Sequence, residues 1–206
     1  MLFNPKIHHR RSIRLKGYDY SQAGLYFITI CVQDRKCLFG KIETNEMMLN
    51  DFGIVANEQW EKLTERFTNF ELDVFQIMPN HIHGIILLTE NVGAGLASAQ
   101  NTNEPPVRNE NINDDKRAGV NPAPTNKTIG DIVGAYKSLV ANECLEIHKR
   151  YWARVNLATT KIPIMGKLWQ RNYYENIIPD EQSYQNISAY IINNPKNWKG
   201  DKFHND

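Results

Sequence analysis

The amino-acid sequence predicts an α+β fold in which an antiparallel β-sheet carries helices on one face. Short apolar runs rich in β-branched and aromatic residues come in pairs, which is typical of antiparallel neighbours. Stretches of helical periodicity separate these pairs, and the βαβ alternation of a doubly wound sheet is missing. The 206 residues are enough to bury a sizeable core, so we expect a single domain spanning residues 1–206.

The first half of the chain predicts a hairpin, a helix and two further strands. Residues 25–32 are dense in strand-forming side chains and residues 36–42 follow a polar turn, so the two runs predict a β-hairpin. Residues 51–67 begin with a capping aspartate and carry apolar side chains at helical spacing. Residues 71–78 and 82–89 are apolar again and predict two more strands.

The second half predicts two helices and a last strand. A helix begins at Thr128 or Asp131, and its apolar residues form one stripe. Residues 167–178 are typical of a strand. A final helix is predicted to start at Pro179-Asp180, to run to Asn194 and to stop at Pro195. The predicted order is therefore β-β-α-β-β-α-β-α.

Two segments differ in composition from the rest of the chain. Residues 91–127 contain mostly small and polar residues, so they bury too little apolar surface to offset ordering entropy. We expect them to form a flexible, low-complexity insert. Residues 1–20 form a basic N-terminal arm in which no acidic residue precedes Asp19.

Charge and hydropathy narrow the class of protein. The net charge of +1 does not by itself indicate nucleic-acid binding. No apolar run approaches the roughly 20 residues that span a bilayer, and the basic N-terminus lacks the apolar core of a secretory signal. We therefore expect a cytoplasmic protein without a membrane segment.

Two histidines at the start of the fourth predicted strand, one just before it and one within it, indicate a metal site. Because strand side chains alternate between faces, His81 and His83 point the same way and Ile82 points to the other face. Two imidazoles on one face can clamp a divalent metal. Such a pair is also compatible with surface or hydrogen-bonded core histidines, so the interpretation needs a third ligand.

The last predicted helix carries further polar groups that suit such a site. Tyr190 and Asn194 are four residues apart, hence on one helical face about one turn from each other. A phenol and an amide oxygen can then approach the same metal. Oxygen and imidazole ligands together favour Mg²⁺ or Mn²⁺ with positions left open for phosphate oxygens.

Five motifs of this sequence resemble those of REP-associated tyrosine transposases, which belong to the single-tyrosine HUH transposases. The likeness covers nearly all of the chain outside the predicted insert. The motifs are RSIRLKGYDY at 11–20, MPNHIHG at 78–84, IVGAYKS at 132–138, LWQRNYYE at 168–175 and YIINNP at 190–195.

The resemblance implies a ferredoxin-like fold and a DNA-processing function. It implies that His81, His83 and Asn194 hold a divalent metal and that Tyr190 is the catalytic nucleophile. The implied substrate is single-stranded DNA that folds into hairpins at palindromic sequences. It would be cleaved and rejoined through a 5′-phosphotyrosine intermediate without ATP, by a monomer or a homodimer.

Several basic and aromatic residues are candidate DNA contacts. The arm can be a solvated terminus, but its cations and tyrosines also suit phosphate contact and base stacking. Two cations further along the chain are weaker candidates and equally compatible with ordinary surface charge. The predicted contacts are Arg10, Arg11, Arg14, Lys16, Tyr18, Lys137 and Arg171.

Some alternatives stay open at this point. Tyr174, in a strand-like segment, is a rival nucleophile to Tyr190. Members of the family often carry His and Arg where this chain has Asn176 and Pro179, so contacts made there are not implied. A metal-dependent phosphodiesterase or nuclease would use the same histidines to activate water, and a hairpin-binding protein would need no catalysis.

Overall fold

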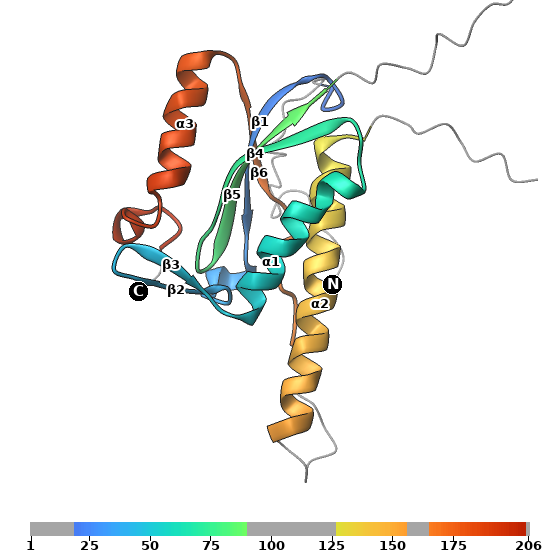
Figure 1. Ribbon diagram of the computed structural model, residues 1–206, viewed down its shortest axis with the longest axis vertical. Helices are drawn as coiled ribbons and strands as arrows, with labels where there is room; N and C mark the ends of the chain where they lie inside the picture. The colour runs from blue at the N-terminus through green and yellow to red at the C-terminus, as the bar shows by residue number, and fades with distance from the viewer. Residues whose placement is uncertain (1–18, 90–126, 156–164, 205–206) are drawn as a thin grey trace, which may run out of the picture.

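The computed structural model describes residues 19–89, 127–155 and 165–204 (Figure 1). Residues 1–18 of the predicted basic arm and residues 91–126 of the predicted insert lie outside this described part of the chain. None of the helices in the described ranges is long and apolar enough to cross a membrane.

The described residues form strands and helices in an order close to the predicted one. Three short 3₁₀ turns accompany them at Gln33–Arg35, Lys62–Glu65 and Trp198–Gly200. The main elements are β1 (Gly24–Cys31), β2 (Gly40–Glu43), β3 (Glu46–Leu49), α1 (Asp51–Glu61), β4 (Phe70–Ile77), β5 (His81–Leu88), α2 (Ile129–Val155), β6 (Tyr174–Ile178) and α3 (Glu181–Asn193).

A four-stranded antiparallel sheet forms the centre of the molecule. Its strand order is β4-β5-β1-β6, and β1 pairs with both β5 and β6. Strands β1 and β4 are joined through α1, and strands β5 and β6 through α2, so two split βαβ units interlock as in ferredoxin-like folds. The predicted α+β class with an antiparallel sheet is confirmed.

The sheet buries apolar side chains on both of its faces. On one face, β1 residues such as Ile28 pack with Trp60 of α1 and Tyr136 of α2 in the larger core. On the other face, Phe27 packs in a smaller cluster with Ile191 of α3. Figure 1 shows α1 and α2 together on one side of the sheet and α3 on the opposite side.

The prediction that the helices gather on one face is therefore wrong for α3. In strand β5 every residue but one is buried, so both faces of this strand need a cover. Helix α3 supplies the second cover because Ile187 and Ile191 face the sheet. This arrangement places the C-terminal end of α3 over the same face to which the two histidines point.

The predicted hairpin between residues 25–32 and 36–42 is also wrong. Both edges of β1 are occupied by β5 and β6, so no edge is left for its sequence neighbour. Strand β2 pairs instead with β3 around Thr44 and Asn45, whose φ angles are 52° and 66°. Two residues with positive φ form the tight turn that fits the twist of a two-residue hairpin.

Several boundaries differ from the sequence prediction, and two of the differences have a clear cause. The last strand begins at Tyr174, because Trp169 makes only an isolated bridge to Val32. Helix α1 is capped by Asn50, whose side chain accepts hydrogen bonds from two backbone N–H groups of the first turn. Asp51 is the first helical residue and not the cap.

Replacement of Gly84 by Ala is expected to destabilise the fold. A Cβ at this position of β5 would lie 2.5 Å from Cζ2 of the buried Trp60. Overpacking of this kind typically costs about 1–3 kcal/mol. Urea unfolding monitors the change, and Gly134→Ala is the matched control because its Cβ would meet nothing within 4 Å. If the Gly84 variant unfolds at the same urea concentration as the wild type, the close packing of Gly84 against Trp60 is contradicted.

Candidate active site

Strand β5 brings His81 and His83 together on the face of the sheet that α3 covers. Both imidazoles are fully buried, and their Nε2 atoms are 3.0 Å apart. The two residues pair across the sheet with Cys31 and Thr29 of β1, respectively. The period-two spacing thus produces the shared orientation that the sequence predicts.

Asn80 determines which nitrogen of His81 carries the proton. The Asn80 amide donates hydrogen bonds from Nδ2 to the carbonyl oxygens of Arg35 (3.1 Å) and Phe203 (2.8 Å). Its Oδ1 therefore faces His81 Nδ1, at 2.8 Å, and accepts a hydrogen bond from the N–H of that nitrogen. The lone pair of His81 is left on Nε2, which points into the site.

His83 is held in a comparable way by Thr29. The hydroxyl of Thr29 lies 2.8 Å from His83 Nδ1 and can accept a hydrogen bond from its N–H, which leaves the lone pair of Nε2 for a metal. Burial lowers the pKa of His81 to about 4. Burial, together with the charge of His81, also holds the pKa of His83 well below its usual value. Both imidazoles are therefore uncharged at neutral pH, as metal ligands must be.

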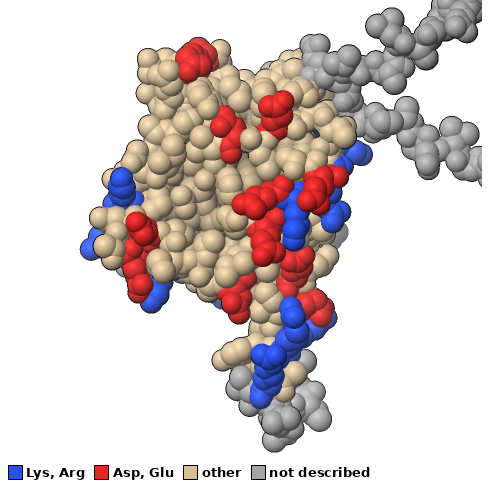
Figure 2. Space-filling view, in the orientation of Figure 1, with Lys and Arg blue, Asp and Glu red and all other residues tan. Residues whose placement is uncertain are grey.

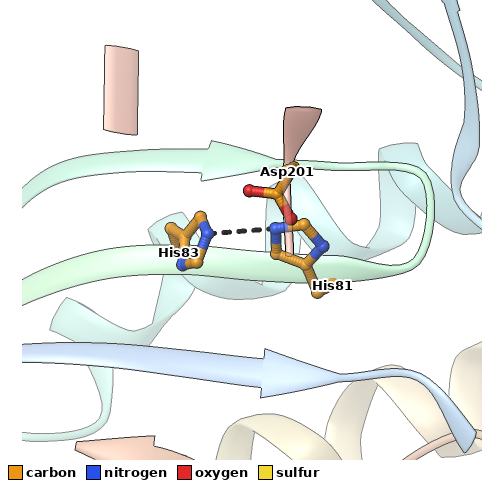
Figure 3. Close-up of side chains that lie close together, drawn as sticks. All are labelled: His81, His83 and Asp201. Atoms are coloured by element: carbon orange, nitrogen blue, oxygen red, sulfur yellow. Dashed lines mark hydrogen bonds between the residues drawn. The ribbon is translucent and has the colours of Figure 1, made fainter. Parts of the chain in front are cut away.

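Asp201 is a site residue that the sequence analysis missed. Its carboxylate and the two imidazoles form a possible metal-binding triad whose ligand atoms all lie within 4.8 Å of one another. Figure 3 shows the carboxylate of Asp201 beside the two rings of β5. Asp201 follows the 3₁₀ turn at Trp198–Gly200 and belongs to no periodic element, so no spacing rule points to it.

Three hydrogen bonds fix the Asp201 carboxylate, and two of them connect it to the C-terminal end of α3. Its Oδ2 accepts from the Tyr190 hydroxyl and from Asn194 Nδ2, each at 2.9 Å. Its Oδ1 accepts from the backbone N–H of Phe203. Burial raises the pKa of Asp201, but the hydrogen bonds from Asn194, Phe203 and Tyr190 and the nearby His81 outweigh this effect. The pKa of Asp201 is therefore below its usual value, and the carboxylate stays ionised at neutral pH.

Tyr190 and Asn194 both reach the site from the end of α3. The Tyr190 hydroxyl is 3.2 Å from His83 Nε2, while 40% of the residue remains exposed. Burial of the phenol and its hydrogen bond to Asp201 raise the pKa of Tyr190 above its usual value. The one-turn spacing predicted from the sequence therefore brings Tyr190 to His83 and Asp201, and Asn194 to Asp201.

Asn194 contains a buried polar atom without a partner. The residue is 1% exposed, and its Oδ1 makes no hydrogen bond with any described residue. A buried amide oxygen in this state is costly unless it meets a ligand or water. Because Nδ2 already donates to Asp201, Oδ1 is the atom that Asn194 can offer to a metal.

These donors together fit a divalent cation. Two ligands about 2.1 Å from an octahedral ion and at right angles to each other are about 3 Å apart, which matches the two Nε2 atoms. The carboxylate of Asp201 adds an anionic oxygen, and Asn194 adds its unpaired amide oxygen. His81, His83 and Asp201 could thus hold a metal ion, with Asn194 beside them.

The remaining predicted residues lie around the site or outside the described part of the chain. Tyr174 lies on β6 with its ring 5.9 Å from that of Phe203, and its hydroxyl makes no hydrogen bond with a described residue. Lys137 donates to the carbonyl oxygens of Gln170 and Arg171, while the side chain of Arg171 is exposed. The arm residues among the predicted contacts are not described: Arg10, Arg11, Arg14, Lys16 and Tyr18.

Replacement of Asn80 by Ala is expected to weaken metal binding about 10–100-fold, as loss of an outer-shell partner does. The variant would free His81 to adopt the other tautomer, with the proton on Nε2. Isothermal titration with Mn²⁺ measures the affinity, and thermal unfolding without metal checks that the fold is intact. Asn57→Ala on α1 is the control. Wild-type affinity in the Asn80 variant would contradict the proposed role.

The sequence of this chain is similar to an uncharacterized protein and to a protein named as a putative transposase. No family model matches it. An uncharacterized protein of Haemophilus influenzae is 41% identical over 206 residues, which cover 99% of this chain and 98% of that protein. A putative REP-associated tyrosine transposase of the same organism is 24% identical over 197 residues, which cover 91% of this chain and 84% of that protein.

A solved structure shares the fold. The REP-associated tyrosine transposase bound to a REP hairpin has a TM-score of 0.52 and 15% sequence identity, over 92% of this chain and 76% of that one. At this identity the likeness concerns the fold alone. The chain belongs to one family with the uncharacterized Haemophilus influenzae protein. It is also similar, at lower identity, to proteins named as REP-associated tyrosine transposases.

Proposed function

We propose that this protein is a metal-dependent transposase and endonuclease of single-stranded DNA. It cleaves and rejoins DNA at hairpin-forming, palindromic sequences through a 5′-phosphotyrosine intermediate at Tyr190. The observation that carries the proposal is the position of the Tyr190 hydroxyl, within hydrogen-bond distance of both Asp201 and His83. A relative named as a putative REP-associated tyrosine transposase, and a similar structure bound to a REP hairpin, support the choice of substrate.

The proposed metal ligands are His81, His83 and Asp201, with Asn194 Oδ1 as a further oxygen. The ligand set expected from the sequence is thereby extended by one carboxylate. The mixture of nitrogen and oxygen donors favours Mg²⁺ or Mn²⁺. When bound, such an ion supplies a Lewis acid that polarises the scissile phosphate and offsets developing charge.

The cleavage step uses the phenol of Tyr190 as nucleophile. Its oxygen forms a bond to phosphorus while the bond from phosphorus to the 3′ oxygen of the neighbouring nucleotide breaks. The raised pKa means that the phenol is protonated before attack, so a proton acceptor is needed. Oδ2 of Asp201, 2.9 Å from the hydroxyl, can accept this proton and return it to the leaving 3′ oxygen.

The products of this step allow the DNA to be rejoined. The phosphotyrosine bond conserves the free energy of the broken phosphodiester, so a 3′ hydroxyl of another DNA end can attack it without a nucleotide cofactor. Tyr190 is suited to this exchange because its ring is partly exposed to an incoming strand and its hydroxyl is held by Asp201. The helix α3 keeps the nucleophile within reach throughout.

Denaturing gel electrophoresis tests the proposal. Labelled single-stranded oligonucleotides that carry a hairpin-forming inverted repeat are incubated with protein and Mg²⁺ or Mn²⁺. We expect a protein–DNA adduct that survives denaturant and is lost on chelation. Cleaved DNA without an adduct would instead identify a hydrolytic nuclease, and bound but uncleaved DNA a hairpin-binding protein.

A further inference from the structure

A groove lies beside the candidate active site and takes no part in the proposed chemistry. It has a volume of about 630 Å³ and lies between the turn of the β2–β3 hairpin and the segment that follows α3. Figure 1 shows these two parts of the chain next to each other. We call it the Trp198 groove, and its polar and aromatic lining consists of Thr44, Asn45, Lys196, Asn197, Trp198 and Lys199.

The Trp198 groove lies next to the site. One of its walls is the segment 195–200, which starts directly after Asn194 and ends directly before Asp201. Within this wall, the ring of Trp198 lies 6.0 Å from the ring of His81, at an interplanar angle of 30°. The groove therefore borders the segment that joins Asn194 and Asp201, the two residues linked by a hydrogen bond at the site.

The charge of the described lining residues suits a polyanion. Lys196 and Lys199 are exposed, form no ion pair with a described residue, and meet no carboxylate among the residues that line the groove. Glu43, in the neighbouring hairpin, is paired with Lys41. Figure 2 shows that most acidic side chains of this face gather over α1 and α2, while acidic and basic side chains lie together near the hairpin and the C-terminal segment.

The uncharged lining residues suit nucleotide bases. Trp198 is half-buried and gives the groove an aromatic surface on which a base can stack, an interaction that tolerates any base. The side chains of Asn45 and Asn197 make no hydrogen bond with a described residue, so their amides are available to base edges. The volume falls within the range of about 300–1,000 Å³ that compact ligands occupy.

We infer that the Trp198 groove binds unpaired nucleotides of single-stranded DNA next to the scissile phosphate. One base stacks on Trp198, and Lys196 and Lys199 contact the phosphates on either side. The identity of the ligand rests on the proposed function, whereas the groove and its lining do not. The groove would hold the strand that enters the site, in addition to any contact made by the hairpin itself.

Fluorescence anisotropy with a labelled oligothymidine of about ten nucleotides tests the inference, with a blunt DNA duplex as comparison. The full chain carries Tyr190→Phe, so covalent chemistry does not enter the measurement. In this background, Lys196→Ala with Lys199→Ala is expected to weaken oligothymidine binding about tenfold. The salt slope should fall by about 1.4, since each lost single-strand phosphate contact contributes about 0.7.

A matched double variant controls for net charge. Lys62→Ala with Lys149→Ala removes the same two charges from exposed ion pairs on other elements and is expected to leave oligothymidine binding within about twofold. Trp198→Ala is expected to lose about tenfold or more, and Trp198→Phe to recover most of the loss because a ring is restored. Thermal unfolding confirms that each variant is folded.

Two results would overturn the inference. One is oligothymidine binding by the lysine and tryptophan variants that equals binding by the control. The other is an equal loss of affinity for the blunt duplex, which has no unpaired bases to stack. Both results are independent of the denaturing gel. If the wild type forms the adduct but the groove variants bind oligothymidine like the control, only the role of the groove is refuted. If the groove variants lose oligothymidine binding but the wild type forms no adduct, only the proposed cleavage is refuted.

Discussion

Replacement of Tyr190 by Phe is expected to reduce covalent protein–DNA adduct by at least about 10⁴-fold. The substitution removes the one atom that bonds to phosphorus, and loss of a nucleophile can cost an enzyme about 10⁶ in kcat. The ring itself, which lies edge-on to Phe27 at a centroid distance of 6.3 Å, is kept, so the fold and DNA binding should be unchanged. Denaturing gels of the adduct and anisotropy of the bound DNA measure the two effects separately.

Tyr174→Phe is the matched control for this experiment. Tyr174 lies on β6, opposite Thr29, and its ring is close to that of Phe203. Its hydroxyl has no hydrogen bond to an acceptor among the described residues, whereas that of Tyr190 meets Asp201. We expect the Tyr174 variant to form adduct at about the wild-type level. Loss of adduct in the Tyr174 variant, with adduct retained in the Tyr190 variant, would exchange the roles of the two tyrosines.

Replacement of His83 by Ala is expected to lower the affinity for Mn²⁺ by about 100-fold or more. Loss of an outer-shell partner already costs about 10–100-fold, and here a ligand atom itself is removed. Isothermal titration of the protein without DNA gives the affinity, so the result does not depend on catalysis. His148→Ala is the control, because this histidine lies against Trp152 on α2.

The same titration decides between the two candidates for the third ligand. Asp201→Asn keeps the shape of the side chain but removes its negative charge, so a loss of about 100-fold is expected if the carboxylate binds the metal. Asn194→Ala removes the neutral amide oxygen and is expected to cost about tenfold. A larger loss in the Asn194 variant than in the Asp201 variant would restore the ligand set that the sequence alone implies.

The parts of the site that follow from local geometry could be predicted from the sequence. The pairing of His81 with His83 depends only on the alternation of side chains along a strand. The pairing of Tyr190 with Asn194 depends only on the rise and turn of a helix. Both relations hold within one element, and both are present in the structure.

The partners across elements could not be predicted in this way. Asp201 reaches the site from an irregular segment, and Asn80 orients His81 through carbonyl oxygens of Arg35 and Phe203, which are far away in the chain. No periodicity connects such residues. Their positions depend on how the segment after α3 packs against the first residue of β5, His81.

The sequence by itself determined the antiparallel α+β class, the existence of most elements and the residue pairs inside β5 and α3. Tertiary structure decided that β1 lies at the centre of the sheet, that α3 covers the opposite face from α1 and α2, and that Asp201 joins the histidines. The physical reason is that local patterns follow backbone geometry, whereas strand partners and helix faces are chosen by the burial of both apolar faces of one sheet.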